Sequence, residues 1–555
     1  SLKVEVPQGQ GWKTVESAGD GKTELPRIVY LRSADVVAPK LRLSGLPANA
    51  SIREIEVYST ATPPWLDVRG DAKGNIIGVL TDGFGSKGIQ TAVTVSGHAA
   101  GHSWTEKTAT GADGAFTLRR PPGLAGPVVF SASWEGQPIT KPVETGDIHE
   151  GLAPKPGGEA TLKLDGKWLF RVDPPAGFER PDAAEGAWSD IEVPSHWVMK
   201  GFHAATGYGG YRKHIQIPED WRGRRIRVAF DGVYSGAEVW WNGVRAGSHL
   251  GGATPGQRDG TEAAKPGDNV LAVRVAEKSI ASELDHMTMY ADLSLAGIFR
   301  SAYVFSTPPV HLARIQSHPE LHRNTASADL VVDLEVVNEA ATPGSGVTVR
   351  LQLLDSGGRV VSSGSQNLDL APWSKAERTV RLPVERPSLW SAEHPNLYTL
   401  ESVVLQGGVE TESLTRKAGF RETRIDGTRI LINGVPVKLR GACHHDSHPL
   451  MGRAVTPALE RQDLELMKEA NLDSLRTSHY PPLPELLDIA DELGVYVEEE
   501  ASFCWVDESS DLRYGALTRQ LTGEMVERDM SHPSVAYWSA GNESRGIDQE
   551  PKDQA

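Results

Sequence analysis

The stretch Asn471–Ser502, NLDSLRTSHYPPLPELLDIADELGVYVEEEAS, decides the fold of the C-terminal part of the chain. It opens with a short strand pattern, LDSLRT, continues into a helix pattern, LPELLDIADELG, and ends in a second strand, VYVEEEAS. Gly494 falls where the helix pattern stops, and glycine is the usual residue just past a helix C-terminus. A strand, a helix and a strand at such short spacing indicate a parallel βα unit.

The same alternation continues on both sides of this stretch. Upstream, GVPVKLRGACHH predicts one apolar strand, and TPALERQDLELMKEANL predicts a helix with Thr456 as its N-cap and Pro457 at its first position. Downstream, ALTRQLTGEMVERDM predicts a helix and SVAYWS a strand. A (β/α)₈ TIM barrel needs eight strands, eight helices and about 250 residues. Residues 422–555 therefore predict strands 1–4 of such a barrel, and we expect the chain to be the N-terminal portion of a longer protein.

The residues before this segment predict a series of β-sandwich modules, because short Val-, Ile- and Leu-rich runs alternate with Gly, Pro, Asn and Asp. In the clearest module Val228, Phe230, Val239 and Trp241 fall at period-two spacing within their runs, as in strands with one buried face. The predicted modules are a partial discoidin-like β module at 1–66, an immunoglobulin-like spacer at 67–150, a jelly-roll domain of the sugar-binding type at 159–309 and an immunoglobulin-like sandwich at 310–421.

Composition and charge argue against several classes of partner. The 555 residues carry a formal net charge of −16, with a pI near 5.6, and phosphate binding depends on Lys and Arg. We therefore expect no nucleic-acid and no membrane partner, and no apolar run approaches the 18 or so residues of a membrane span. The two cysteines, Cys443 and Cys504, form neither a disulfide framework nor a zinc pattern.

Polar and titratable residues follow each predicted barrel strand, in the tracts HHDSH, RTSHYP, EEEAS and GNES. A barrel builds its active site at this edge. Hydrolysis of a glycosidic bond needs a carboxylic acid that protonates the leaving oxygen and a second carboxylate that attacks or activates water. Glu543 is the candidate acid, with the aromatic strand end Tyr537–Ser539 as its nonpolar surroundings. The adjacent Asn542 can donate to a sugar hydroxyl.

Other interpretations of these tracts are less favoured. The tract HHDSH is not expected to bind a metal, because His444 and His445 point to opposite sides of an extended segment and no second ligand pairs obviously with His448. Cys443 is expected to be a buried thiol at a strand end rather than a nucleophile. Alternation sends the outer two residues of Glu498–Glu500 to one side and the middle one to the other, so at least one carboxylate should be buried and paired.

Three motifs resemble glycoside hydrolase family 2, which includes β-galactosidases, β-glucuronidases and β-mannosidases. They are Arg440–Ala454 (RGACHHDSHPLMGRA), Asn471–Pro481 (NLDSLRTSHYP) and Asp529–Ser544 (DMSHPSVAYWSAGNES), with Ser531 where asparagine is usual. The resemblance runs from about residue 159 to residue 544, through the sandwich, the immunoglobulin-like domain and the half-barrel in the family's order.

The resemblance implies a retaining, exo-acting β-glycosidase that removes terminal β-linked sugars through a covalent glycosyl-enzyme. Glu543 would be the general acid/base. The nucleophile would be a Glu near the end of barrel strand 7, outside the 555 residues, so we expect no turnover from these residues alone. Arg476 would support that nucleophile, and Asn542 would bind the hydroxyl next to the reacting carbon. The substrate-binding residues implied are Asn542, His445, His479, Arg476 and Tyr480.

The sequence departs from the magnesium-dependent β-galactosidases of this family, in which a Glu and a His after strand 3 help to hold the metal. Cys504 and Val506 stand at those positions, and neither suits a hard cation. We therefore expect no such magnesium and no cofactor, which makes a β-galactosidase of that type less favoured. The sugar and its linkage are not predicted, and homo-oligomer formation stays open.

Two alternatives to this interpretation remain. One is a noncatalytic carbohydrate-binding or adhesion protein on the same scaffold. The other is a family-5-like glycanase, which shares the Asn–Glu pair at strand 4 but predicts neither the upstream sandwiches nor the SHYP tract. The leading hypothesis, the β-glycosidase, carries the expectation of an extracellular or periplasmic location.

Overall fold

The computed structural model describes residues 3–8, 11–17, 42–44 and 64–544, apart from 84, 86, 135, 149, 286–294, 323–324 and 507–511. The chain divides into two compact units, Ser1–Pro64 and Trp65–Ala555. In the first unit β1 (Lys3–Gln8), β2 (Gly11–Ser17) and β3 (Arg42–Ser44) form an antiparallel sheet in the order β2-β1-β3. Most of the predicted discoidin-like module at 1–66 lies outside the described residues, and that assignment stays a prediction.

The second unit begins with a two-sheet sandwich in the region predicted as a spacer. Its sheets have the orders β4-β5-β8 and β10-β9-β6-β7, and apolar side chains such as Val93, Phe116 and Phe130 fill the core between them. Its strands are β4 (Trp65–Gly70), β5 (Asn75–Thr81), β6 (Ala92–Ala99), β7 (His102–Ala109), β8 (Ala115–Arg119), β9 (Leu124–Trp134) and β10 (Gln137–Glu144).

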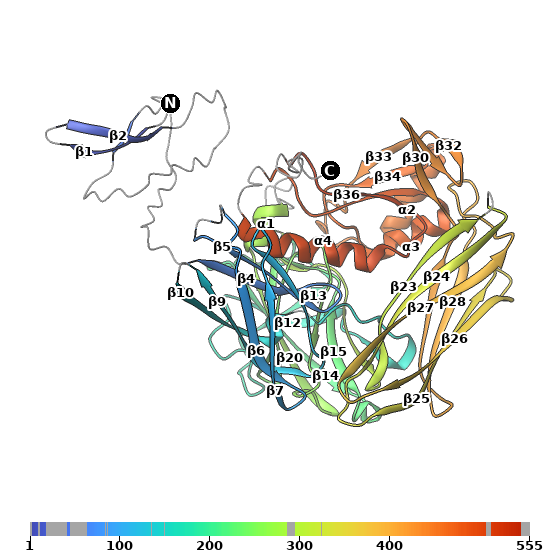
Figure 1. Cartoon of the computed structure of the whole chain (residues 1–555), viewed down its shortest axis with the longest axis horizontal. Helices are drawn as coiled ribbons and strands as arrows, with labels where there is room; N and C mark the ends of the chain where they lie inside the picture. Colours follow the sequence, from blue (N-terminus) through green and yellow to red (C-terminus); the bar gives the residue numbers. More distant parts are fainter. Residues whose placement is uncertain are drawn as a thin grey trace. The chain divides into compact units, whose positions relative to one another are not determined.

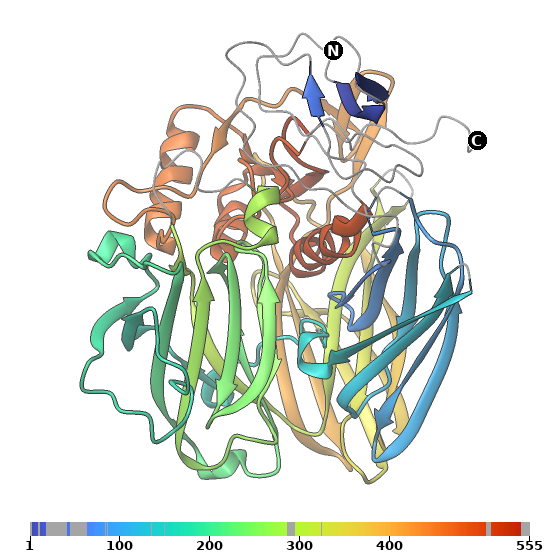
Figure 2. The same ribbon diagram turned by 90° about the vertical axis from the view of Figure 1, so that its left-hand side faces the viewer.

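The next sandwich packs a four-stranded sheet, β11-β22-β15-β19, and a six-stranded sheet, β13-β12-β14-β20-β17-β18, around a core rich in tryptophan. Its later strands run side by side in green in Figure 2. Val228, Phe230, Val239 and Trp241 are all buried, as the period-two pattern predicts. The jelly-roll assignment itself stays a prediction.

The elements of this sandwich are β11 (Thr161–Lys163), β12 (Gly166–Val172), β13 (Ser189–Val193), β14 (Tyr208–Ile217), β15 (Arg225–Phe230), β16 (Val233–Tyr234), β17 (Gly236–Trp241), β18 (Val244–Leu250), β19 (Gly256–Asp259), β20 (Gly267–Ala276), α1 (Ile280–Asp285), β21 (Gly297–Ile298) and β22 (Ala302–Thr307).

A third sandwich follows, with sheets β23-β24-β27 and β26-β25-β28-β29 around a core of Val and Leu side chains. Its strands are β23 (Val310–His322), β24 (Ser327–Asn338), β25 (Gly344–Leu354), β26 (Val360–Leu370), β27 (Ser374–Glu385), β28 (Tyr398–Gln406) and β29 (Val409–Ala418).

The barrel segment starts with a small antiparallel sheet of β30 (Thr423–Asp426), β31 (Arg429–Ile432) and β32 (Val435–Val437). The prediction of one strand over GVPVKLRGACHH is therefore wrong, because β32 pairs with β31 and a separate strand, β33 (Gly441–His444), begins the parallel sheet. The remaining elements are α2 (Pro457–Glu469), β34 (Ser474–Thr477), α3 (Pro484–Leu493), β35 (Tyr496–Glu500), α4 (Gly515–Asp529) and β36 (Val535–Ser539).

The strands β33, β34, β35 and β36 pair in this order and in parallel, with α2, α3 and α4 between them in the chain (Figure 1). The predicted helix signals act as expected. The side chain of Thr456 accepts a hydrogen bond from the N–H of Leu459, and Gly494 ends α3 at a φ of 73°. Among the described residues no helix is both long enough and apolar enough to span a membrane.

Hydrogen bonds from the sandwiches hold the barrel segment in place. Arg300, which precedes β22, is fully buried and donates from Nη2 to Asp446 Oδ2 (3.1 Å) and to the carbonyl of Pro481 (2.8 Å). The N–H of Ser317 on β23 donates to Ser531 Oγ (3.0 Å). Ser531, where asparagine is usual, thus receives a bond from the third sandwich.

Candidate active site

The four strand ends bring distant residues to one edge of the sheet. Carboxyl ends of parallel strands meet at the same edge, and the register pairs Cys443 with Arg476 and Arg476 with Glu498. Beyond these positions lie His445, the tract ending in His479, and the loop after β36 that carries Asn542. The sequence prediction that these residues share one edge is confirmed.

Glu500, the last residue of β35, is the centre of the cluster and is completely buried. Its Oε2 accepts from Arg476 Nε (2.7 Å), from Arg476 Nη2 and from Ser539 Oγ (2.7 Å). Its Oε1 lies 2.6 Å from His479 Nδ1. Burial by itself lowers the pKa of Arg476, but the hydrogen bonds and charge of Glu500 raise it above its ordinary value. The guanidinium is therefore a permanent cation at the strand ends.

Asn542 is buried and held by contacts on both sides of its amide. Its Oδ1 accepts from Arg476 Nη2 (3.0 Å), and its Nδ2 donates to Cys504 Sγ (3.4 Å). The preceding residue, Gly541, has a φ of 148°, and a Cβ there would lie 2.6 Å from the carbonyl oxygen of Phe503. The close approach of the two backbones therefore requires glycine.

Glu543 is exposed, and its backbone has a φ of 48°. Its Oε2 accepts a hydrogen bond from Trp505 Nε1 (2.7 Å). The sequence assigned its aromatic surroundings to Tyr537–Ser539, but the aromatic group that bonds it comes from the loop after β35. Tyr537 instead packs with the buried Trp390 and Tyr496. Glu543 thus presents a hydrogen-bonded carboxylate next to the buried Asn542.

The two predicted histidines lie together. The ring centroids of His445 and His479 are 5.5 Å apart, with the planes at 89°. Burial and the charge of Arg453 lower the pKa of His445 to about 4, so its ring is neutral near pH 7. Their contact with a sugar stays a prediction.

Tyr480 lies deeper than these histidines. It is 2 % exposed, its hydroxyl accepts from the guanidinium of Arg453, and its ring centroid is 6.2 Å from that of His445. Tyr480 is thus buried near the His445 ring and does not reach the surface with His479. The substrate contact implied for Tyr480 stays a prediction.

The structure contradicts one of the remaining sequence predictions and confirms another. Cys443 is exposed, so the prediction of a buried thiol is wrong; its sulfur lies 4.0 Å from Arg476 Nη1. The prediction that one carboxylate of Glu498–Glu500 is buried and paired is confirmed, since Glu499 and Glu500 are both fully buried. Sequence reasoning missed Trp505, although it stands within the tract that follows β35. The expected absence of a magnesium ion stays a prediction.

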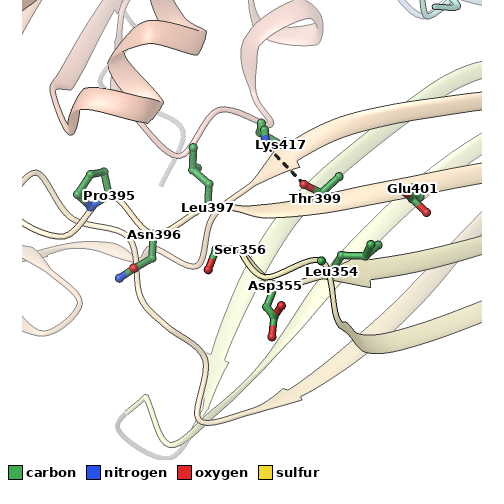
Figure 3. Close-up of a pocket in the computed structure, with 10 residues that line it drawn as sticks. Leu354, Asp355, Ser356, Pro395, Asn396, Leu397, Thr399, Glu401 and Lys417 are labelled. Carbon is green, nitrogen blue, oxygen red and sulfur yellow. Dashed lines mark hydrogen bonds between the residues drawn. The ribbon is translucent and has the colours of Figure 1, made fainter.

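A cavity of about 500 Å³ lies in the third sandwich rather than at the strand ends (Figure 3). It is lined by Asp355, Asn396, Glu401 and Lys417 among others, and Lys417 Nζ donates to Thr399 Oγ1 (3.4 Å). None of its lining residues is aromatic. It contains none of the residues that cluster at the strand ends.

Three family models match consecutive parts of the chain, and together they cover more than half of it. They are Glycosyl hydrolases family 2, sugar binding domain (residues 202–308), Glycosyl hydrolases family 2 (310–421) and Glycosyl hydrolases family 2, TIM barrel domain (423–553). The chain belongs to glycosyl hydrolase family 2.

Curated relatives match over most of this chain. A β-galactosidase of Priestia megaterium is 29% identical over 478 residues, which cover 74% of this chain and 45% of that protein. A β-galactosidase of Aeromonas hydrophila is 33% identical over 431 residues, covering 69% and 40%. The chain therefore spans less than half the length of the curated relatives it matches.

Solved structures of similar fold match over most of this chain. A family 2 member from Bacteroides cellulosilyticus has a TM-score of 0.62 and 28% identity, covering 70% of this chain and 53% of that one. The β-glucuronidase of Ruminococcus gnavus in its apo form has a TM-score of 0.61 and 26% identity, covering 70% and 68%.

Proposed function

We propose that the protein to which these residues belong is a retaining, exo-acting β-glycosidase of family 2. The observation that carries the proposal is the exposed carboxylate of Glu543 beside the buried Asn542, on one sheet edge with Arg476, His445 and His479. The family 2 relatives are β-galactosidases and β-glucuronidases, which supports a terminal β-linked sugar as the substrate class.

Glu543 serves as the general acid and then as the general base. In the first step its proton passes to the leaving glycosidic oxygen, and in the second the carboxylate takes a proton from the attacking water. Trp505 orients the carboxylate through its bond to Oε2. The other carboxylate oxygen then faces the reacting centre.

Asn542 serves as the donor to the sugar hydroxyl next to the reacting carbon. Its amide has two N–H groups, and one of them is directed at Cys504 Sγ. The bond from Arg476 to Oδ1 fixes which end of the amide carries the donors. The second N–H remains for a hydroxyl, and a bond that shortens at the transition state lowers the barrier.

The second carboxylate comes from a later barrel strand in this proposal. A retaining enzyme needs its two carboxyl groups about 5–5.5 Å apart, with the nucleophile open to the sugar. Glu500 does not meet this requirement, because it is fully buried and both of its oxygens are engaged by Arg476, His479 and Ser539. Glu500 positions Arg476 and His479 instead.

The test uses the full-length protein and aryl β-galactoside and β-glucuronide substrates. We expect wild-type hydrolysis, and we expect Glu543→Ala to lose on the order of 10²–10⁴ in rate, as for a lost general acid/base. Azide should restore part of the turnover and give a β-glycosyl azide. The control is Glu469→Ala, which removes an exposed carboxylate from α2.

Two results would contradict the proposal. Full activity of Glu543→Ala would remove this residue from the mechanism. Sugar binding without hydrolysis by the wild-type protein would instead support the noncatalytic carbohydrate-binding alternative.

A further inference from the structure

A second cluster of titratable side chains lies on the opposite side of β33 from the candidate active site. His445 faces the strand-end cluster, whereas His444 faces α2. The Nε2 atom of His444 lies 3.2 Å from Asp463 Oδ2 and 3.5 Å from Glu460 Oε2. Its Nδ1 atom lies 3.8 Å from Asp446 Oδ1. One imidazole is thus surrounded by three carboxylates.

The polar atoms of this cluster are buried and incompletely bonded. Glu460 is 1 % exposed, and its Oε2 atom takes part in no hydrogen bond. The Nδ1 atom of His444 is also buried without a hydrogen bond. A buried polar atom without a partner costs roughly 1–3 kcal/mol, and more for a charged group. Two such atoms within one cluster therefore indicate a ligand that supplies the missing interactions.

Asp446 keeps one oxygen available for this cluster. Its Oδ2 accepts from Arg300 Nη2 (3.1 Å) and from the N–H of Leu483 (2.9 Å), and the side chain is 2 % exposed. These bonds fix the carboxylate with Oδ1 on the side of His444. The orientation is therefore set by the rest of the protein before any ligand binds.

The spacing of the donor atoms fits one small metal ion. Nitrogen and oxygen ligands lie about 2.0–2.2 Å from zinc in tetrahedral sites, which puts neighbouring ligand atoms roughly 3.3–3.6 Å apart. Asp463 Oδ2 and Glu460 Oε2 lie 3.2 and 3.5 Å from His444 Nε2, close to that range. Asp446 Oδ1 lies 3.8 Å from the other ring nitrogen, Nδ1, and faces the ring from that side. One donor atom each from His444, Asp446 and Glu460 lies within 4.8 Å of the others.

We propose that His444, through Nε2, and Glu460 bind a divalent transition-metal ion such as Zn²⁺, with Asp463 completing the site from the solvent side and Asp446 orienting the imidazole from its Nδ1 side. Imidazole and carboxylate donors suit zinc and similar ions, whereas magnesium and calcium prefer oxygen ligands alone. The half-exposed Asp463 provides the path of entry.

The ion has a structural role in this proposal, because it connects β33 to α2. His445 follows His444 directly in the chain, so fixing the His444 ring also fixes the backbone that directs His445 into the strand-end cluster. The sequence disfavoured a metal at HHDSH because His444 and His445 point to opposite sides and no second ligand pairs obviously with His448. The structure supplies the partners from α2 instead.

The experiment measures metal binding by the full-length protein and does not depend on its activity. Protein stripped with EDTA is titrated with Zn²⁺ by calorimetry, and after dialysis the bound metal is counted by mass spectrometry. We expect one Zn²⁺ per chain. Since loss of a second-sphere partner already weakens metal affinity 10–100-fold, we expect Glu460→Gln and His444→Gln to weaken it at least that much.

Glu465→Gln is the matched control, since it makes the same change on the exposed face of the same helix and should bind like the wild type. Substitution with Co²⁺ gives an independent measurement, because its visible absorption reports the ligands and should change in His444→Gln.

Two outcomes would overturn the proposal. One is the absence of stoichiometric Zn²⁺ in the wild-type protein, a result that no variant's folding can affect. The other is wild-type affinity in both Glu460→Gln and His444→Gln, which would assign the ion to another cluster such as Asp488, Asp491 and His532.

Discussion

We expect His532 to stabilise, in a pH-dependent way, the segment that carries Asn542 and Glu543. Its Nδ1 lies 2.7 Å from Asp491 Oδ2, and Asp491 Oδ1 accepts from the N–H of Ser534 (2.8 Å). The pair therefore joins α3 to the start of β36. The perturbation is His532→Gln, which keeps a donor for Asp491 but removes the titratable charge.

The size of the stabilisation by His532 can be calculated from the shift in its pKa. Burial by itself lowers this pKa, but the charge and hydrogen bond of Asp491 raise it from 6.5 to about 9. Such a difference between folded and unfolded states corresponds to about 3 kcal/mol. Because the side chain is 21% exposed, solvent screening reduces the expected value to about 2–3 kcal/mol.

The direction of the pKa shift decides whether the stabilisation by His532 grows or declines as the pH rises. A raised pKa means that the folded state binds the proton more tightly, so the stabilisation is fully present below pH 6.5 and is lost as the pH rises through about 9. The free energy of unfolding of the wild-type protein should therefore exceed that of His532→Gln by about 2–3 kcal/mol at pH 6. At pH 10 the two values should be nearly equal.

Urea denaturation followed by circular dichroism at 222 nm measures this difference. Among the described residues every α-helix longer than six residues lies in the barrel segment, so the helical signal reports unfolding there. The control is His98→Gln, which changes an exposed histidine of β6. A gap between wild type and His532→Gln that is equal at pH 6 and pH 10 would refute the reasoning.

Substitutions at three further positions test other parts of the barrel segment by the same urea assay. Glu500→Ala should lower the free energy of unfolding by about 3–5 kcal/mol, because the Arg476 guanidinium loses its buried partner; a loss below 1 kcal/mol would contradict this. Thr456→Ala should cost about 1 kcal/mol through loss of the α2 N-cap, and Thr456→Ser should recover most of it. Gly541→Ala should lower the free energy of unfolding by more than 1 kcal/mol, because its Cβ would meet the Phe503 carbonyl and its φ is positive. Wild-type stability of this variant would show that the backbone here can shift at little energetic cost.

The sequence by itself determined the alternation of helices and strands from α2 to β36 and the edge where the candidate site lies. The caps at Thr456 and Gly494 and the alternation in Val228–Phe230 are local signals, and the structure places each as predicted. The tracts at the ends of parallel strands share one edge by the rules of the fold, so the sequence could place Arg476 near Asn542 without coordinates.

Only the tertiary structure decided which side chains meet. Glu500 is the buried centre because it contacts Arg476 and Ser539, which lie 24 and 39 residues away in the chain. The bond from Trp505 to Glu543 spans 38 residues, and the placement of His444 against α2 depends on how that helix packs on β33. Sheet register and helix packing set these pairings. The distances between the paired side chains are fixed by residues far apart in the chain, so local sequence patterns carry no information about them.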